Sequence, residues 1–147
     1  MELNGETLRF IREHCKDDVR SLALQAPKYP GVDMSVALTQ IAGRQAAAEK
    51  IPSWHEEEGV LYPRHLSLEQ CSSEATARYK ASIIPESSSG TLTDLTGGFG
   101  IDCAFLSPKF HHVTYVERQE VLCEIASHNF PLLGLNHIQI ENKDGIR

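Results

Sequence analysis

The sequence predicts an α/β fold, in which an N-terminal helical region precedes a β-α-β-α-β unit with parallel strands. Three observations carry this prediction: a glycine-rich stretch at 91–102, a short apolar strand at 112–117, and another at 137–141. The stretches 101–106 and 118–135, which follow the first two strands, have the apolar spacing that is typical of helices. Strands that alternate with helices in this way indicate a parallel sheet with right-handed crossovers.

The N-terminal region, residues 1–65, is predicted to be a small helical domain. Its apolar residues recur at helical spacing, and an Asn or Asp stands at each expected helix start, where the side chain can cap the first turn. We therefore expect helices over about 5–15, from Asp17 to Pro27, and over about 33–50. Trp54 follows them and is expected to dock between two layers of the fold.

Residues 66–147 are predicted to form the α/β domain. Ser67-Leu-Glu-Gln70 has the pattern of a capping box, and it predicts a helix that continues to Ile84. This helix leads into the glycine-rich stretch, and one of its faces carries Ala75, Tyr79 and Ile83.

The glycine-rich stretch predicts a ligand-binding turn between a strand at 91–95 and a helix. Gly97, Gly98 and Gly100 carry no Cβ, so the backbone can turn sharply and approach a ligand closely. The free N–H groups of the following helix would face that ligand. Asp94 stands before the glycines, and its carboxylate would repel a pyrophosphate but suit a cation.

Three interpretations of this turn remain open from the residues alone. A dinucleotide fingerprint needs a third small residue where the chain has Cys103. S-adenosylmethionine carries an ammonium and a sulfonium and no phosphate, so it agrees better with Asp94. The third interpretation is a glycine-rich turn in an α/β domain that binds no cofactor.

Two further acids follow strands and favour a cofactor site. Glu117 ends the strand at 112–117, close to the separation of about 20 residues from Asp94 at which a second strand delivers a carboxylate to a ribose diol. Asp144 lies in the loop after the third strand. We expect the three acids to form one constellation at the carboxyl ends of the strands.

The glycine-rich stretch resembles motif I of class I S-adenosylmethionine-dependent methyltransferases, D-x-G-x-G-x-G. Asp94, Gly98 and Gly100 match the motif, and Thr96 replaces its first glycine. The segment 67–81 is similar to the pattern S-L-E-Q-x-[ST]-x-E-x-x-A-x-[YH]-[KR]-A of a bacterial group of these enzymes. That group carries a THUMP-like domain near the C-terminus.

The resemblance implies S-adenosylmethionine as the cofactor and a role for each site residue. Asp94, or a water that it holds, would meet the methionine ammonium, and backbone groups of Gly97 to Gly100 would line the methionine. Thr96, in the same turn, is a further cofactor-binding candidate. Glu117 would accept both ribose hydroxyls, and Asp144 would take the adenine amino group. The last two candidates, which would cover the methionine end but equally suit simple helix capping, are Gln70 and Ser73.

The resemblance also implies that the chain is the N-terminal half of a Rossmann-like methyltransferase domain. Enzymes of the group continue to a fourth strand that ends in a D/N-P-P-like motif, and nothing before Arg147 matches it. We therefore expect a fragment that is inactive alone and holds no catalytic residues. RNA is the methyl acceptor that the resemblance implies. Without a fourth strand, the edge of the strand at 91–95 is open, which predicts self-association.

Composition narrows the alternatives. The net charge of −6 and the pI of about 5.6 exclude an electrostatic nucleic-acid clamp on composition alone. No apolar run approaches the ~18 residues of a membrane span, and the N-terminus has no secretory signal. The four cysteines lack metal-ligand spacing, so we expect reduced, mostly buried thiols in a cytoplasmic protein. The alternatives to a methyltransferase are a non-catalytic α/β scaffolding or docking module and a nicotinamide-dependent oxidoreductase.

Overall fold

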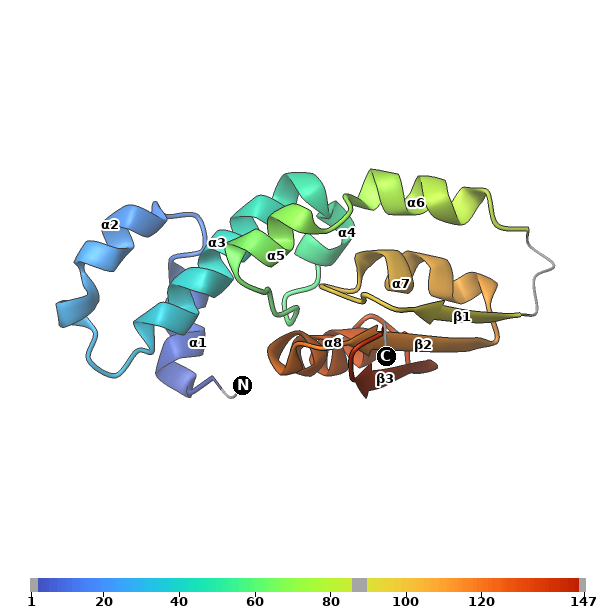
Figure 1. The fold of residues 1–147 in the computed structure, drawn as a ribbon. Coiled ribbons are helices and arrows are strands. Elements are labelled where there is room, and N and C mark those ends of the chain that lie inside the picture. The colour runs from blue at the N-terminus through green and yellow to red at the C-terminus, as the bar shows by residue number, and fades with distance from the viewer. Residues whose placement is uncertain (1–2, 86–89, 146–147) are drawn as a thin grey trace.

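A computed structural model describes residues 3–85 and 90–145 of the chain. Helices form one end of the molecule, and a three-stranded sheet lies at the other end (Figure 1). The elements before the sheet are α1 (Gly5–Glu13), α2 (Val19–Leu24), the 3-10 turn η1 (Ala26–Lys28), α3 (Met34–Lys50), α4 (Pro52–His55), α5 (His65–Gln70) and α6 (Glu74–Ser82).

The sheet has the order β1-β2-β3, and both pairings are parallel. Leu92 lies opposite Val113, which in turn lies opposite Ile138, so the apolar positions of neighbouring strands are in register. The fold prediction is therefore confirmed: a helical N-terminus precedes a parallel β-α-β-α-β unit. The elements of this unit are β1 (Thr91–Asp94), α7 (Ile101–Leu106), the 3-10 turn η2 (Ser107–Lys109), β2 (His112–Glu117), α8 (Glu120–Leu132) and β3 (Ile138–Asn142).

Side-chain caps start the first three α-helices as predicted. Asn4, Asp18 and Asp33 each accept a hydrogen bond from the backbone N–H three residues later. At the other end of the chain, α8 closes at Gly134, whose φ of +77° is the left-handed conformation of a helix C-terminus.

The single helix predicted from Ser67 to Ile84 is wrong, because the structure has two helices, α5 and α6. Lys50 Nζ donates to the carbonyls of Leu68 and Glu69 at 2.7 and 2.8 Å. In a continuous helix those carbonyls would accept from the backbone four residues later, so the lysine replaces those bonds and α5 ends. The chain is extended at Ser73, whose side chain caps α6 through the Thr76 N–H.

The predicted apolar face of this segment is wrong for the same reason. Tyr79 and Ile83 are 69% and 66% exposed, whereas Glu74 and Ala77 are buried. The break at Cys71–Ser73 sets the rotation of α6 independently of α5, so the periodicity assumed across the whole segment does not apply.

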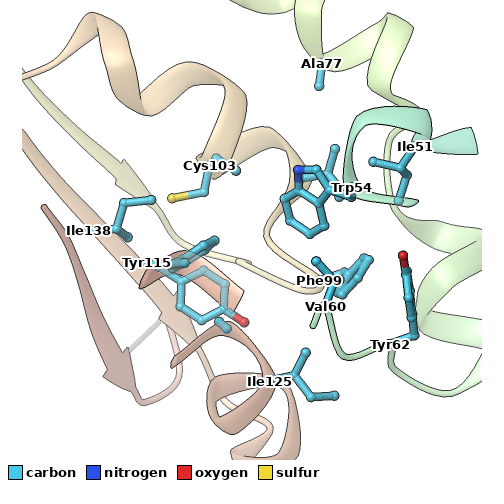
Figure 2. Packing of buried hydrophobic residues seen from close by; sticks show 14 of the residues in the cluster. Ile51, Trp54, Val60, Tyr62, Ala77, Phe99, Cys103, Tyr115, Ile125 and Ile138 are labelled. Atoms are coloured by element: carbon cyan, nitrogen blue, oxygen red, sulfur yellow. The ribbon is translucent and has the colours of Figure 1, made fainter. Parts of the chain in front are cut away.

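Two hydrophobic clusters hold the molecule together. The first lies among α1, α2 and the first half of α3, and its buried members are Phe10, Ile11, Leu22, Ala37 and Ile41. The second, part of which is drawn in Figure 2, extends from Ala47 to Ile138 and includes the sheet. Because Ala47, Trp54 and Tyr62 belong to the second cluster, the end of the helical region packs into the α/β core. The domain boundary at residue 65 stays a prediction.

Trp54 joins the helical region to the glycine-rich turn. It is 3% exposed, and its ring centroid lies 5.1 Å from that of Phe99 in an edge-on arrangement (Figure 2). The docking role expected for the tryptophan is confirmed. Since Phe99 lies inside the turn, this contact positions the turn from the N-terminal side.

Two remaining expectations concern the state of the cysteines and the presence of a membrane-spanning helix. All four cysteines are free; Cys103 and Cys123 are buried, whereas Cys15 and Cys71 are partly exposed. Within residues 3–85 and 90–145, no helix is long and apolar enough to cross a lipid bilayer.

Candidate functional site

A cleft of about 340 Å³ lies where β1 and β2 end. Its walls come from α5 and the connection after it, the glycine-rich turn, the start of α7, the end of β2 and the start of α8. The carboxyl ends of parallel strands are the usual place for a ligand in an open α/β sheet. The predicted site residues that line the cleft are Gln70, Asp94, Thr96, Gly97, Gly98, Gly100 and Glu117.

The glycine-rich turn is fastened to β2 by its backbone. The Gly97 N–H donates to the Val116 carbonyl at 2.8 Å. A Cβ at Gly97 would lie 2.7 Å from Tyr115 Cζ and closer still to two other carbons of that ring. Gly98 has a φ of +56°, which residues with a side chain rarely adopt. The turn therefore needs glycine for close approach at one position and for its conformation at the next.

Glu117 is a buried carboxylate at the cleft, with 7% of the residue exposed. Its Oε1 accepts from the Gly98 N–H at 3.2 Å, and its Oε2 accepts from the Gln119 N–H. An ionised carboxylate offers about four acceptor positions. Two backbone bonds therefore fix its orientation and leave acceptor capacity for a ligand, as the predicted ribose role requires.

Asp94 ends β1, and its Oδ1 accepts from the Thr96 N–H at 3.2 Å. Burial raises the pKa of Asp94, and the nearby carboxylates of Asp102 and Glu117 raise it further, against the opposing effects of the Thr96 N–H and Lys80. The carboxylates of Asp102 and Glu117 thus disfavour a negative charge on Asp94 in a poorly solvated space. A cation in the cleft would relieve this repulsion.

Asp102, in the first turn of α7, is a cleft residue that the sequence analysis did not identify as a site residue. Its Oδ2 accepts from Ser72 Oγ at 3.0 Å and from Lys80 Nζ at 3.1 Å. This network ties the α5–α6 connection and α6 to the start of α7. Among the described residues, Asp102 Oδ1 is the buried side-chain oxygen left without a hydrogen-bond partner. The sequence signal that could have identified Asp102 as a site residue is its position two residues after Gly100.

Two predicted site residues lie outside the cleft lining. Ser73 caps α6, which is the capping interpretation that the sequence left open. Asp144 lies in the loop after β3 and is partly buried. Its neighbour Gly145 lies so close to the carbonyl of Leu95 that a Cβ there would collide with it, so this loop reaches the end of β1. The ligand roles of Ser73 and Asp144 stay predictions.

The chemistry of the lining favours a cation with hydroxyl groups. Asp94, Asp102 and Glu117 contribute three carboxylates, and no lysine or arginine is among the described residues that line the cleft. Polyphosphate sites instead offer cationic side chains or backbone donors without opposing acids. In the described part of the chain, no group of three or more His, Cys, Asp or Glu side chains is arranged to hold a metal.

Comparison with known proteins identifies a related fold. No family model and no curated protein matches this chain. A crystal structure described as a "putative methyltransferase" from Porphyromonas gingivalis matches with a TM-score of 0.73 and 29% sequence identity. The match covers 95% of this chain and 34% of that one, so this chain spans about a third of the other's length. The chain therefore has a methyltransferase-like fold, with a helical N-terminus and a three-stranded parallel half-domain.

Proposed function

We propose that this chain is the S-adenosylmethionine-binding half of a methyltransferase. The observation that carries the proposal is the lining of the cleft, which combines a glycine-rich turn with three carboxylates. Among the described residues, no lysine or arginine lines it. S-adenosylmethionine has an ammonium, a sulfonium and a ribose diol, which are groups that carboxylates bind. When bound, it supplies a methyl group activated for in-line transfer.

The residues present fit this cofactor on two counts. The buried Asp102 Oδ1 lacks a hydrogen-bond partner among the described residues, and such orphan acceptors are commonly completed by a ligand, water or ion. At Gly98, a Cβ would meet only the Thr96 carbonyl oxygen, at 3.7 Å. The space that a side chain at Gly98 would take is therefore open to the cleft and is not filled by core residues.

Each predicted site residue then has a proposed role. Glu117, held by two backbone donors, accepts the ribose hydroxyls, and Asp94 faces the ammonium directly or through water. The backbone from Thr96 to Gly100 lines the methionine, with Gln70 over it. Asp144 takes the adenine amino group, and Ser73 supports the methionine end by starting α6.

The wider activity is proposed by likeness. The segment at 67–81 supports membership of the bacterial methyltransferase group with a THUMP-like domain, and the same likeness supports RNA as the acceptor and a cytoplasmic location. The acceptor site and the catalytic residues would belong to further parts of a longer enzyme. This chain's own contribution is to bind and orient the methyl donor.

Calorimetric titration of S-adenosylhomocysteine into this chain, with NAD as the control ligand, tests the proposal. We expect binding of S-adenosylhomocysteine alone. Glu117→Gln should weaken it at least about tenfold, because hydrogen bonds to a charged acceptor are worth about 1.5–3 kcal/mol. Glu141→Gln is the matched control, since Glu141 pairs with Lys143 outside the cleft lining. Binding of NAD alone, or equal affinity in Glu117→Gln, would contradict the proposal.

A further inference from the structure

We infer that Tyr115 is a positioning residue of the cofactor cleft. Its hydroxyl fixes the peptide between Gly98 and Phe99, so that the Phe99 N–H is presented to the amino-acid end of the ligand. This inference rests on the proposed function and concerns a residue that contributes no lining atom of its own to the cleft.

Both backbone polar groups of Gly98 are held by side chains of β2. Tyr115 Oη donates to the Gly98 carbonyl at 2.5 Å, and the Gly98 N–H donates to Glu117 Oε1 at 3.2 Å. Tyr115 and Glu117 are two residues apart on the strand, so they project from the same face. Gly98 has no side chain, and its φ is +56°. The two side chains of β2 therefore hold it in this conformation.

The Tyr115 ring is itself immobilised. The residue is fully buried, its ring lies directly beneath Gly97, and it meets the Phe130 ring edge-on at a centroid distance of 5.6 Å (Figure 2 shows Tyr115 in the core). The Leu122 carbonyl lies 3.4 Å from the hydroxyl as a second, longer acceptor. The hydroxyl is therefore a fixed point from which the Gly98 carbonyl is oriented.

Orientation of that carbonyl determines the direction of the next N–H. In a trans peptide the C=O and the N–H point in opposite directions, so the Phe99 N–H points away from the Tyr115 ring. The Phe99 side chain is buried against Trp54 and Tyr62. Phe99 is nevertheless one of the residues that line the cleft, and the inference assigns its backbone N–H to the cleft side.

The charges of the cleft explain why the Phe99 N–H would matter for binding the amino-acid end of the ligand. The three carboxylates attract an ammonium and a sulfonium, but they repel the α-carboxylate of the same amino-acid group. With no lysine or arginine among the described lining residues, backbone N–H groups are the donors suited to that carboxylate. The adenosine end of the ligand has no carboxylate, so it does not require these N–H donors.

Tyr115→Phe, which removes one oxygen atom from the core, tests the inference by calorimetry with two ligands. S-adenosylhomocysteine has the amino-acid group, and 5′-methylthioadenosine lacks it. We expect the variant to bind S-adenosylhomocysteine roughly five- to tenfold more weakly, the value of one buried hydrogen bond, and to bind 5′-methylthioadenosine unchanged. Tyr29→Phe, in the N-terminal cluster, is the matched control and should bind both ligands as the unsubstituted chain does.

The outcomes separate the inference from the proposed function. Unchanged affinity of Tyr115→Phe for S-adenosylhomocysteine, or an equal loss for both ligands, would overturn the inference, because a merely structural role affects both ligands alike. If the unsubstituted chain binds neither ligand, the proposed function is refuted instead. Amide exchange measured by NMR without ligand checks the positioning itself: faster exchange at Phe99 in the variant supports it, and unchanged exchange overturns it.

Discussion

Gly97→Ala should destabilise the whole α/β core, although it adds a single methyl group. The new Cβ would lie 2.7 Å from Tyr115 Cζ, with two other ring carbons nearer. Real Cβ contacts are not that short, so either the ring or the turn has to move. The ring cannot move freely, because it is fully buried and packed against Phe130. The turn cannot move without losing the bond from the Gly97 N–H to Val116.

The magnitude follows from these two constraints. Overpacking a well-filled core costs about 1–3 kcal/mol, and a clash with a rigid, buried aromatic ring belongs at the upper end of that range. For a chain of 147 residues, about 2–3 kcal/mol lowers the melting temperature by roughly 5–10 °C. Thermal unfolding followed by circular dichroism measures this shift.

Gly5→Ala is the matched control for the same substitution. A Cβ at Gly5 meets nothing within 4 Å, and the residue is the first of α1. Alanine there should leave the melting temperature unchanged or raise it slightly, since alanine is the better helix former. If Gly97→Ala melts within about a degree of the unsubstituted chain, the contact between the turn and Tyr115 does not constrain the fold, and the reasoning is refuted.

Two further predictions concern Asp94 and the edge of the sheet. Burial raises the pKa of Asp94 above its ordinary value of 3.8, so the folded state binds this proton more tightly and loses stability as pH rises through the folded pKa. Asp94→Asn should therefore raise the melting temperature at pH 7 but not at about pH 3, and a gain of equal size at both would contradict this. Among the described strands β1 pairs only with β2, and Leu95, the residue after β1, is 54% exposed although the loop at Gly145 contacts its backbone. We predict a dimer in sedimentation velocity that Leu95→Lys weakens, because a lysine blunts an exposed edge; a monomer at all concentrations would contradict it.

The convergence of Asp94 and Glu117 could be predicted because it depends only on strand order. Parallel neighbours end at the same edge of a sheet, so residues that terminate β1 and β2 lie near one another at that edge. In the register Asp94 lies opposite Tyr115, two residues before Glu117, and both carboxylates line the cleft. Local spacing was enough for this part of the site.

Asp102 and the break between α5 and α6 could not be predicted in the same way. The capping box predicted at Ser67 is wrong, because α5 already begins at His65 with Arg64 as its N-cap and no side-chain capping bond. The serine that does cap a helix is Ser73, at the start of α6, and the sequence alone does not choose between the two. The choice depends on Lys50, which reaches the carbonyls of Leu68 and Glu69 from α3. The same break brings Ser72 to Asp102, a contact between residues far apart in sequence.

Thr96, the departure from motif I, is explained by where the turn contacts β2. Thr96 is exposed, and its N–H already bonds to Asp94, so a side chain at this position meets no obstacle. One residue later the backbone lies directly on the Tyr115 ring, and there only glycine fits. A large aromatic residue beneath the turn thus determines which position must be glycine. It follows that the tolerance of Thr96 and the strict requirement at Gly97 are two consequences of Tyr115, so substitutions at 97 and 115 should be non-additive in stability, whereas those at 96 and 115 should add.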